Sequence, residues 1–255
     1  MAGVLITGAT GLIGRHTMAA WPESLDPVVV RRTVDDLLGP GVFAGLVRDL
    51  APDVVLHLAW TASSTPGYRS SPANAAWHAA SLDAARACLE LGSRFVGTGT
   101  VVDDQPHGDA YAAAKSRLRA DLAAAIDAGE VTWLRPHYVF DPDGPSPAVL
   151  REAVAARTAG RPVALSTPTA AHDFVHAADV GRAVVAAVLD GLTGVVDVGS
   201  GRLRTVQALV EAAGATWESA APAASGPQGS GRADVAALLR TGWLPSDTED
   251  FFAHD

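Results

Sequence analysis

A tyrosine and a lysine four residues apart are the side chains of this sequence best suited to proton transfer. Tyr111 and Lys115 belong to the segment Tyr-Ala-Ala-Ala-Lys, and residues i and i+4 of a helix lie on one face about one turn apart. A neighbouring ammonium group stabilises a phenolate and thereby lowers the pKa of a tyrosine. Such a phenol can exchange a proton with an alcohol or carbonyl oxygen while a hydride moves at the adjoining carbon. The alternative is a half-buried tyrosine beside a solvated lysine.

Two threonine hydroxyls lie just upstream of this pair. Thr98 and Thr100 follow an apolar run at residues 94–97 that is typical of a buried strand. A hydroxyl at the carboxyl end of this strand can hold the reacting oxygen of a substrate while the phenol moves the proton. The threonines therefore favour a catalytic interpretation of Tyr111 and Lys115.

A glycine-rich segment near the N-terminus predicts an anion-binding site. Residues 3–16 read Gly-Val-Leu-Ile-Thr-Gly-Ala-Thr-Gly-Leu-Ile-Gly-Arg-His, so an apolar run leads into three regularly spaced glycines. Gly8 permits a tight turn, Gly11 lets the backbone approach a pyrophosphate, and Gly14 lets a helix pack on the strand. Backbone N–H groups and the helix dipole then favour a negatively charged ligand. We therefore predict a dinucleotide site, with a purely structural turn as the alternative.

Two arginines indicate which dinucleotide is bound. The apolar run at residues 27–31 ends in Arg31 and Arg32, and no acidic residue occupies this position. An acidic side chain at this strand end holds the ribose 2′-hydroxyl of NAD, whereas arginine can grip a 2′-phosphate with two hydrogen bonds. Arg15 could add positive charge from the first helix. The sequence therefore favours NADP(H) over NAD(H), and the alternative is a solvated arginine pair.

Alternating strand-like and helical stretches predict the scaffold that positions these residues. Strands are expected at 4–7, 27–31, 54–58, 94–97, 132–135, 163–165, 174–176 and 195–198. Helices are expected at 15–21, 41–50, 73–91, 111–128 and 147–159, and loops at 61–72, 140–147 and 219–231. This alternation predicts an α/β fold with a doubly wound parallel sheet, in which ligands lie at the carboxyl ends of the strands.

The composition limits the class of protein. The 255 residues are 48% hydrophobic and 18% charged with a net charge of −9, which suits a globular protein without a nucleic-acid-binding surface. No apolar stretch approaches the roughly 20 residues of a membrane span, and a strand starting at residue 4 leaves no room for a signal peptide. Cys88 is the only cysteine, and the eight histidines show no metal-binding spacing, so no metal site is expected. A cytoplasmic location is expected.

Taken in order, these motifs resemble the extended branch of the short-chain dehydrogenase/reductase superfamily, the NAD-dependent epimerase/dehydratase family, whose members modify nucleotide sugars. The similar segments cover nearly the whole chain and comprise Thr7–Gly14, Asp36–Leu38, Asp53–Ala59, Phe95–Thr100, Tyr111–Lys115, Arg135–Phe140, His172–Val180, Gly194–Gly201 and Asp234–Pro245. The resemblance implies a Rossmann core at 1–145 with a returning segment at about 172–200. A smaller substrate-binding lobe is implied mainly at 146–255.

The resemblance also implies roles for individual residues. Tyr111 would be the general acid or base, Thr100 would orient the substrate oxygen, and Lys115 would lower the tyrosine pKa and bind the nicotinamide ribose. Thr98 is the alternative hydroxyl if the register along the strand differs by two. The cofactor would contact Gly8, Thr10, Gly11, Leu12, Ile13, Gly14, Arg31, Arg32, Asp36, Leu37, Leu58, Ala59, Lys115, Pro136 and His137. Substrate contacts would come from Trp60, Thr98, His137, Tyr138, His172 and Arg232.

Departures from the family pattern narrow the reaction. Sugar-nucleotide dehydratases carry an Asp-Glu pair after the catalytic threonine, whereas Val101 and Val102 follow Thr100 here, so elimination of water is not expected. The main expectation is an NADPH-dependent ketoreductase acting on a 4-keto sugar nucleotide or a similar small metabolite. The alternatives are a nucleotide-sugar epimerase, whose bound cofactor takes and returns the hydride, and a non-catalytic NADP-binding regulator.

Three further expectations concern single residues and assembly. Asn74 is the candidate for an asparagine that the family carries on the helix before the catalytic strand. His57 and His176 are expected to be structural. The resemblance implies a homodimer formed through the helices at 73–91 and 111–128.

Overall fold

The computed structural model describes residues 3–30, 34–62, 65–103, 109–141, 148–221 and 230–247. Its largest element is a six-stranded sheet in the order β10-β5-β4-β3-β1-β2, and every neighbouring pair is parallel. These strands are β1 (Val4–Thr7), β2 (Val28–Val29), β3 (Val54–His57), β4 (Arg94–Thr98), β5 (Val131–Pro136) and β10 (Gly194–Val198). The predicted doubly wound α/β fold is confirmed.

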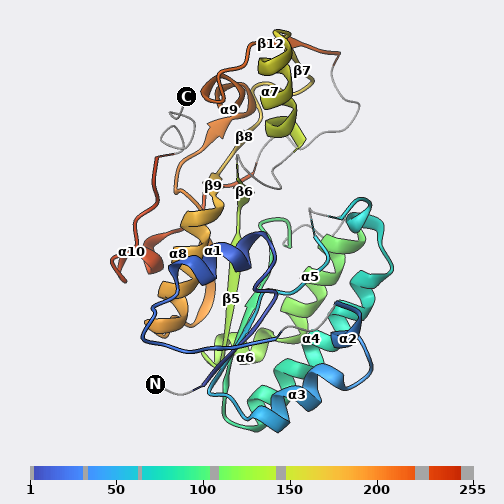
Figure 1. Cartoon of the computed structure of the whole chain (residues 1–255), viewed down its shortest axis with the longest axis vertical. Helices are drawn as coiled ribbons and strands as arrows, with labels where there is room; N and C mark the ends of the chain where they lie inside the picture. Colours follow the sequence, from blue (N-terminus) through green and yellow to red (C-terminus); the bar gives the residue numbers. More distant parts are fainter. Residues whose placement is uncertain are drawn as a thin grey trace.

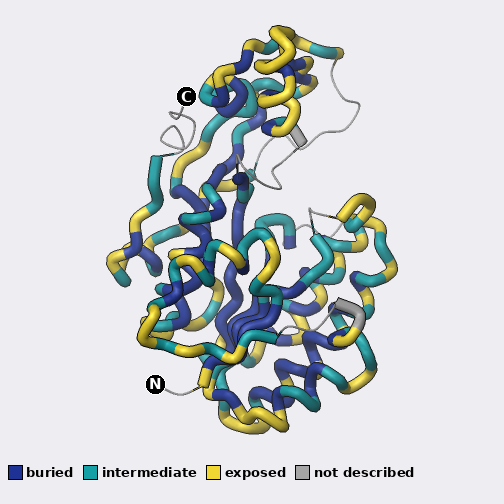
Figure 2. The backbone as a smooth tube through the Cα atoms, viewed as in Figure 1, coloured by how far each residue is buried: buried dark blue, intermediate teal, exposed yellow. Residues whose placement is uncertain are grey.

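Helices cover both faces of this sheet (Figure 1). One face carries α3 (Val42–Leu50), α4 (Ala73–Glu90), α5 (Ala110–Asp121) and α6 (Ala123–Asp127), and the other carries α1 (Leu12–Ala20) and α8 (Ala177–Leu189). Side chains alternate along β1, so Leu5 lies in the first core while Val4 and Ile6 lie in the second. Because both faces are buried, the strands are continuous apolar runs. The central strands are accordingly dark blue in Figure 2.

The strand order reverses next to β1. The chain passes from β1 to β2 on one side and then returns to β3 on the other side of β1. In doubly wound sheets, ligands bind beyond the carboxyl ends of the strands at such a reversal. The glycine loop that follows Thr7 and the residues that follow His57 lie at this place. The predicted dinucleotide site is therefore where this architecture binds ligands.

A second, smaller core lies away from the sheet, at the top of Figure 1. Its elements are α7 (Ala148–Ala159), β7 (Val163–Leu165), α9 (Val206–Ala212) and β12 (Trp217–Ser219). Two further strand pairs connect it to the sheet, namely β6 (Tyr138–Phe140) with β9 (Phe174–His176) and β8 (Ala171–His172) with β11 (Arg204–Thr205). The short helices α2 (Val34–Leu37) and α10 (Ala236–Leu239) complete the elements, with a 3-10 turn at Tyr68–Ser70. The domain boundary at residue 145 stays a prediction.

Several parts of the sequence fold differently from expectation. The helix expected at 111–128 is two helices, because Leu122 leaves helical geometry with φ −102° and ψ 2°. Helix α8 and the shorter helices α2, α9 and α10 have no counterparts among the expected helices. Nine of the 13 residues of α8 are alanine or valine, and most of these are buried, so its sequence resembles a buried strand as closely as a helix. No helix among the described residues is both long and apolar enough to cross a membrane.

Candidate active site

The glycine loop lies close enough to neighbouring backbone that side chains would not fit. Gly8 has φ +75°, and a Cβ there would collide with the backbone of Ala59. A Cβ on Gly14 would collide with the carbonyl oxygen of Gly8, whereas one on Gly11 would lie 3.3 Å from that oxygen. Gly11 also caps α1, whose first N–H groups have no side-chain acceptor. The loop therefore has the close-packed geometry and the free backbone donors that a dinucleotide phosphate needs.

A chain of three polar side chains forms the floor beneath this loop. Thr7 Oγ1 lies 2.7 Å from His57 Nδ1, and His57 Nε2 lies 2.8 Å from Ser81 Oγ. Burial, with a smaller effect of Lys115, lowers the pKa of His57 to about 3, so the ring stays neutral. These hydrogen bonds join β1, β3 and α4. The structural role expected for His57 agrees with this arrangement.

Thr100 and Tyr111 are brought together beyond the end of β4. Tyr111 stands in the first turn of α5, where Asp109 caps the helix by accepting a hydrogen bond from the Ala112 N–H at 2.9 Å. The Thr100 side chain lies beside the phenol of Tyr111, where it opposes the rise of the tyrosine pKa. The hydroxyl of Thr98 instead donates to the backbone carbonyl of His57 at 3.1 Å. Of the two threonines, Thr100 is therefore the one whose side chain acts on the tyrosine.

The electrostatics of Tyr111 differ from the expectation for the pair. Burial raises the pKa of Tyr111 above its ordinary value, and Tyr68 adds to the rise. The cation that opposes this rise is Arg69 and not Lys115. The phenol is consequently protonated at neutral pH, which suits a proton donor.

Lys115 is buried, with only 3% of its surface exposed. Its ammonium group donates a hydrogen bond to the Thr98 carbonyl oxygen at 2.5 Å and lies 3.6 Å from the centre of the Trp60 ring. Burial lowers the pKa of Lys115 to about 7, and the nearby Asp103 opposes the shift. Lys115 is also the only lysine of the chain, because every other member of its 19 Lys and Arg residues is an arginine. This compositional signal marks the residue independently of any motif.

Sequence analysis did not predict that Arg69, Tyr68 and Asp109 would lie beside Tyr111. Arg69 donates to the Asp109 carboxylate at 2.6 Å and lies 5.3 Å from the centre of the Tyr68 ring. Tyr68 in turn meets Tyr111 edge to face at 5.2 Å. These residues come from a loop and a one-turn helix, which carry no periodic signal in the sequence. Only tertiary structure brings them to the tyrosine.

Other predicted contacts are scattered around this centre. Tyr138 stacks on His172 with ring centres 4.0 Å apart, and the His172 ring lies 3.2 Å from Ser230 Oγ. Arg15 forms an ion pair with Asp141, so its charge is shared with that carboxylate. Arg232 is exposed. Arg31 and Arg32 lie outside the described residues, so the predicted phosphate contact has no described geometry.

The remaining predicted cofactor residues flank the two strand ends. Leu58 and Ala59 follow β3, and Leu37 is buried while its neighbour Asp36 is exposed. Thr10, Leu12 and Ile13 belong to the turn and first helix, and Pro136 ends β5. His137 is buried, with its Nε2 atom 3.6 Å from an Asp197 oxygen.

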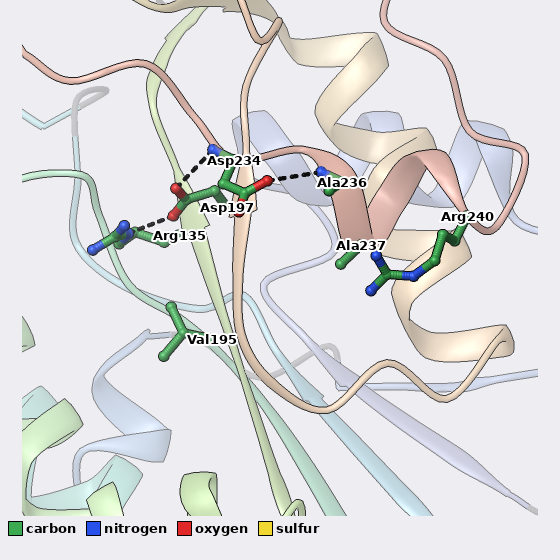
Figure 3. A pocket seen from close by; sticks show the side chains of 7 residues that line it. All are labelled: Arg135, Val195, Asp197, Asp234, Ala236, Ala237 and Arg240. Atoms are coloured by element: carbon green, nitrogen blue, oxygen red, sulfur yellow. Dashed lines mark hydrogen bonds and ion pairs between the residues drawn. The ribbon is translucent and has the colours of Figure 1, made fainter.

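A shallow hollow of about 290 Å³ lies at the edge strand β10 (Figure 3). It is lined by Arg135, Val195, Asp197, Asp234, Ala236, Ala237 and Arg240. The Arg135 guanidinium donates to Asp197 at 2.5 Å, and the Asp234 N–H donates to the same carboxylate at 3.1 Å. Although burial opposes the change, His137 and Arg135 hold the pKa of Asp197 below its ordinary value. None of the predicted site residues lines this hollow.

Comparison with protein families shows which family the chain belongs to. The model of the NAD dependent epimerase/dehydratase family matches residues 4–199. The chain belongs to this family. No curated protein gives a significant match. The family's nicotinamide cofactor fits the glycine loop described above, because its glycines leave backbone donors accessible at a helix start.

Solved structures with this fold are similar over their whole length. UDP-glucose 4-epimerase from Thermus thermophilus, in complex with NAD, has 23% identity and a TM-score of 0.71, with 98% of each chain covered. UDP-N-acetylglucosamine 4-epimerase from Methanobrevibacter ruminantium has 19% identity and a TM-score of 0.74, covering 98% of this chain and 96% of that one. RMD from Pseudomonas aeruginosa, complexed with NADPH, has 22% identity and a TM-score of 0.75, with 98% and 96% covered. At these identities the likeness shows the fold.

Proposed function

We propose that this family member is an NADPH-dependent ketoreductase in which Tyr111 donates the proton. The observation that carries the proposal is that the Thr100 side chain and Tyr111 lie together beyond the carboxyl end of β4, where Lys115 is bonded to the Thr98 carbonyl. A cofactor held by that loop supplies the hydride. The phenol O–H protonates the developing alkoxide, and the Thr100 hydroxyl orients the same oxygen. Burial raises the pKa of Tyr111, which favours a donor over a base.

Lys115 has the second role in this mechanism. Its buried ammonium group lies one helical turn from Tyr111 and is hydrogen-bonded at the end of β4. There it can donate to the ribose hydroxyls of the cofactor and stabilise negative charge near the reacting oxygen. We place Gly8, Gly11 and Gly14 against the pyrophosphate, and Arg31 and Arg32 against a 2′-phosphate.

The substrate that we propose is a 4-keto sugar nucleotide or a smaller ketone. Two structural neighbours are 4-epimerases of UDP-linked sugars, which supports a nucleotide-linked substrate. Val101 and Val102 follow Thr100 in place of an acid–base pair, which disfavours elimination of water. We also propose a homodimer through α4 and α5, to be tested by measuring the mass in solution.

Epimerisation is the second candidate, and the same neighbours favour it. An epimerase would interconvert UDP-sugars without net consumption of cofactor. A ketoreductase would consume one NADPH for each ketone reduced. Product analysis with UDP-glucose and no added NADPH tests for epimerisation, and product analysis with a 4-keto sugar nucleotide and NADPH tests for reduction.

The experiment that tests the mechanism is Tyr111→Phe. We expect turnover of a keto-sugar panel to fall by about 10²–10⁴-fold, because the proton donor is removed. NADPH affinity, measured by fluorescence titration, should stay within about twofold because the phenol does not hold the cofactor phosphates. Unchanged turnover would remove Tyr111 from the mechanism.

The cofactor preference has its own test. The double variant Arg31→Ala/Arg32→Ala should weaken NADPH binding much more than NADH binding, because only NADPH carries the 2′-phosphate. Titrations of wild type and variant with both cofactors make the comparison. Equal weakening of the two cofactors would contradict the phosphate contact.

A further inference from the structure

Trp60 stands between the cofactor-binding strand end and the catalytic helix. It is three residues beyond the end of β3, and its ring centre lies 3.6 Å from the Lys115 ammonium nitrogen. The same ring meets Tyr111 at 6.4 Å, nearly perpendicular. An ammonium group over an indole face is attracted by the negative potential of the ring, and the attraction is strongest where water is excluded. Lys115 is buried, so this condition is met.

The orientation of Trp60 is itself held by other side chains. Its indole N–H donates to Asn74 Oδ1 at 2.9 Å, and its ring stacks on Trp77 at 5.8 Å. The amide nitrogen of Asn74 donates to the carbonyl oxygens of Tyr68 and Ser71 at 2.7 and 3.0 Å. Asn74 is 2% exposed, and both ends of its amide are occupied. Its side chain therefore fixes the indole and is not available to a substrate.

Among the residues that the structure describes, no carboxylate forms a direct ion pair with the Lys115 ammonium. Asp103 acts on it at longer range from the loop after β4, His57 faces it from β3, and Tyr111 precedes it on its own helix. The Asp103 carboxylate itself accepts from the Thr100 N–H at 3.2 Å and the Trp133 indole at 2.9 Å. In the described part of the chain, the Thr98 carbonyl is the one hydrogen-bond acceptor of the ammonium. Two of its three N–H donors thus remain for a ligand.

We propose that Trp60 is a positioning residue for Lys115, its indole face holding the ammonium group charged and directed at the cofactor side. An ion-pair partner in this place would compete with a ligand for the N–H donors. An aromatic face stabilises the charge while leaving those donors free. The inference rests on the proposed function in one respect, namely that Lys115 serves the reaction. It reassigns Trp60 from substrate contact to support of the lysine.

The single lysine of the chain makes the test direct. Protein grown with isotope-labelled lysine gives one side-chain signal, so an NMR titration reads the pKa of Lys115 without any substrate. Trp60→Leu removes the aromatic face, and we expect the pKa of Lys115 to fall by about one pH unit. Trp60→Phe keeps a face and should restore most of the difference. Equal pKa values in wild type, Trp60→Leu and Trp60→Phe would overturn the proposal.

Binding of NADPH at two pH values separates positioning from simple structural damage. At pH 5 the lysine is charged in wild type and variants alike, so Trp60→Leu should bind NADPH nearly as wild type does. At pH 8 the variant should bind several-fold more weakly, because a lower pKa leaves less of its lysine charged. Equal weakening at both pH values would indicate a structural defect and contradict the proposal. A wild-type protein that shows these effects but reduces no ketone would contradict the proposed reaction alone.

Two further variants complete the design. Asn74→Ala leaves the indole but removes its hydrogen bond, and it should lower the Lys115 pKa by a smaller amount in the same direction. It replaces Trp60→Leu if that variant does not fold, and an unchanged pKa would then count against the proposal. Trp217→Leu is the matched control, because Trp217 lies in β12 and its indole is bonded to Glu211 at 2.7 Å. It should leave the Lys115 pKa unchanged.

Discussion

Two buried bases lie in neighbouring parts of this molecule and are held in opposite ways. In the His57 cluster, formed by Thr7, His57 and Ser81, both ring nitrogens have a hydroxyl partner within 2.8 Å. In the Lys115 cluster, formed by Trp60, Thr98 and Lys115, one carbonyl and one aromatic face hold an ammonium group. Burial lowers the pKa of His57 to about 3, whereas the pKa of Lys115 falls only to about 7.

The difference shows how burial produces either a rigid support or a functional group. The buried His57 ring stays neutral and keeps its contacts, because both of its nitrogens are hydrogen-bonded to neutral hydroxyl groups. An ammonium group with free donors and a pKa near neutrality can respond to a ligand. The first arrangement fixes β1 against β3 beneath the glycine loop, and the second faces the predicted reaction.

The largest expected effect comes from Lys115→Met. Turnover should fall by about 10²–10⁴-fold, because the variant has no cation at the reacting end of the site. The wild type should gain free energy of unfolding relative to the variant as pH rises from 7 towards 10. In that range the unfolded lysine binds a proton that the folded one has released, so stability rises with pH by up to about 1.4 kcal/mol per unit. Urea unfolding of both proteins at pH 7 and pH 9 measures this, and a constant difference between them would contradict the buried, titrating lysine.

A smaller effect, on stability alone, is expected from His57→Leu. The substitution leaves the hydroxyls of Thr7 and Ser81 without their partner, and we expect a loss of about 2–4 kcal/mol in the free energy of unfolding.

Protonation of His57 should make the free energy of unfolding depend on pH in the acid range, as protonation of Lys115 does above pH 7. Because the folded pKa of His57 is about 3 and the unfolded value is 6.5, the unfolded chain binds the extra proton between these values. Wild-type stability should therefore decline as pH falls from about 6.5 towards 3, and His57→Leu should lack this part of the decline. Thermal unfolding at pH 7 and pH 5 tests both statements. The pKa of Lys115 should change less in His57→Leu than in Trp60→Leu. Equal changes would contradict the separation of the two clusters.

The smallest expected effect comes from Ser81→Ala, which removes one of the two partners of His57. We expect a loss of about 1 kcal/mol, since a single buried hydrogen bond to a neutral group is affected. Ser70→Ala is the control, because the Ser70 side chain is exposed and its bond to Gly67 is local. Chemical denaturation of the two variants side by side makes the comparison, and equal stability losses would mean that the cluster contributes nothing specific.

Local sequence was sufficient for much of the scaffold. The run Val4–Thr7 is a strand as predicted, and so are Val163–Leu165 and Phe174–His176, because short apolar or aromatic runs bounded by polar or glycine residues have few other solutions. In the described part of the predicted loop at 61–72, residues Tyr68–Ser70 form a short 3-10 turn. Helix α8 was not predicted, because a mostly buried run rich in alanine and valine resembles a buried strand as closely as a helix.

In the candidate site, too, some features followed from the local sequence and others only from the tertiary structure. Some of the candidate groups are close together in the sequence, so the order of residues alone indicated that they could act together. These are the three glycines of the loop, Gly8, Gly11 and Gly14, and the pair Tyr111 and Lys115. The choice of Thr100 over Thr98 as the partner of Tyr111 depended on where the hydroxyls point, which a two-residue repeat leaves open.

The partners of the two buried bases were decided by tertiary structure alone. His57 meets Thr7 across 50 residues and Ser81 across 24, and the Trp60 ring covers a lysine from another element. Pairings at such separations are set by strand order and helix packing, which no local pattern encodes. The sequence determined which chemistry the chain carries, and the fold decided which base is locked in place and which remains available to a ligand.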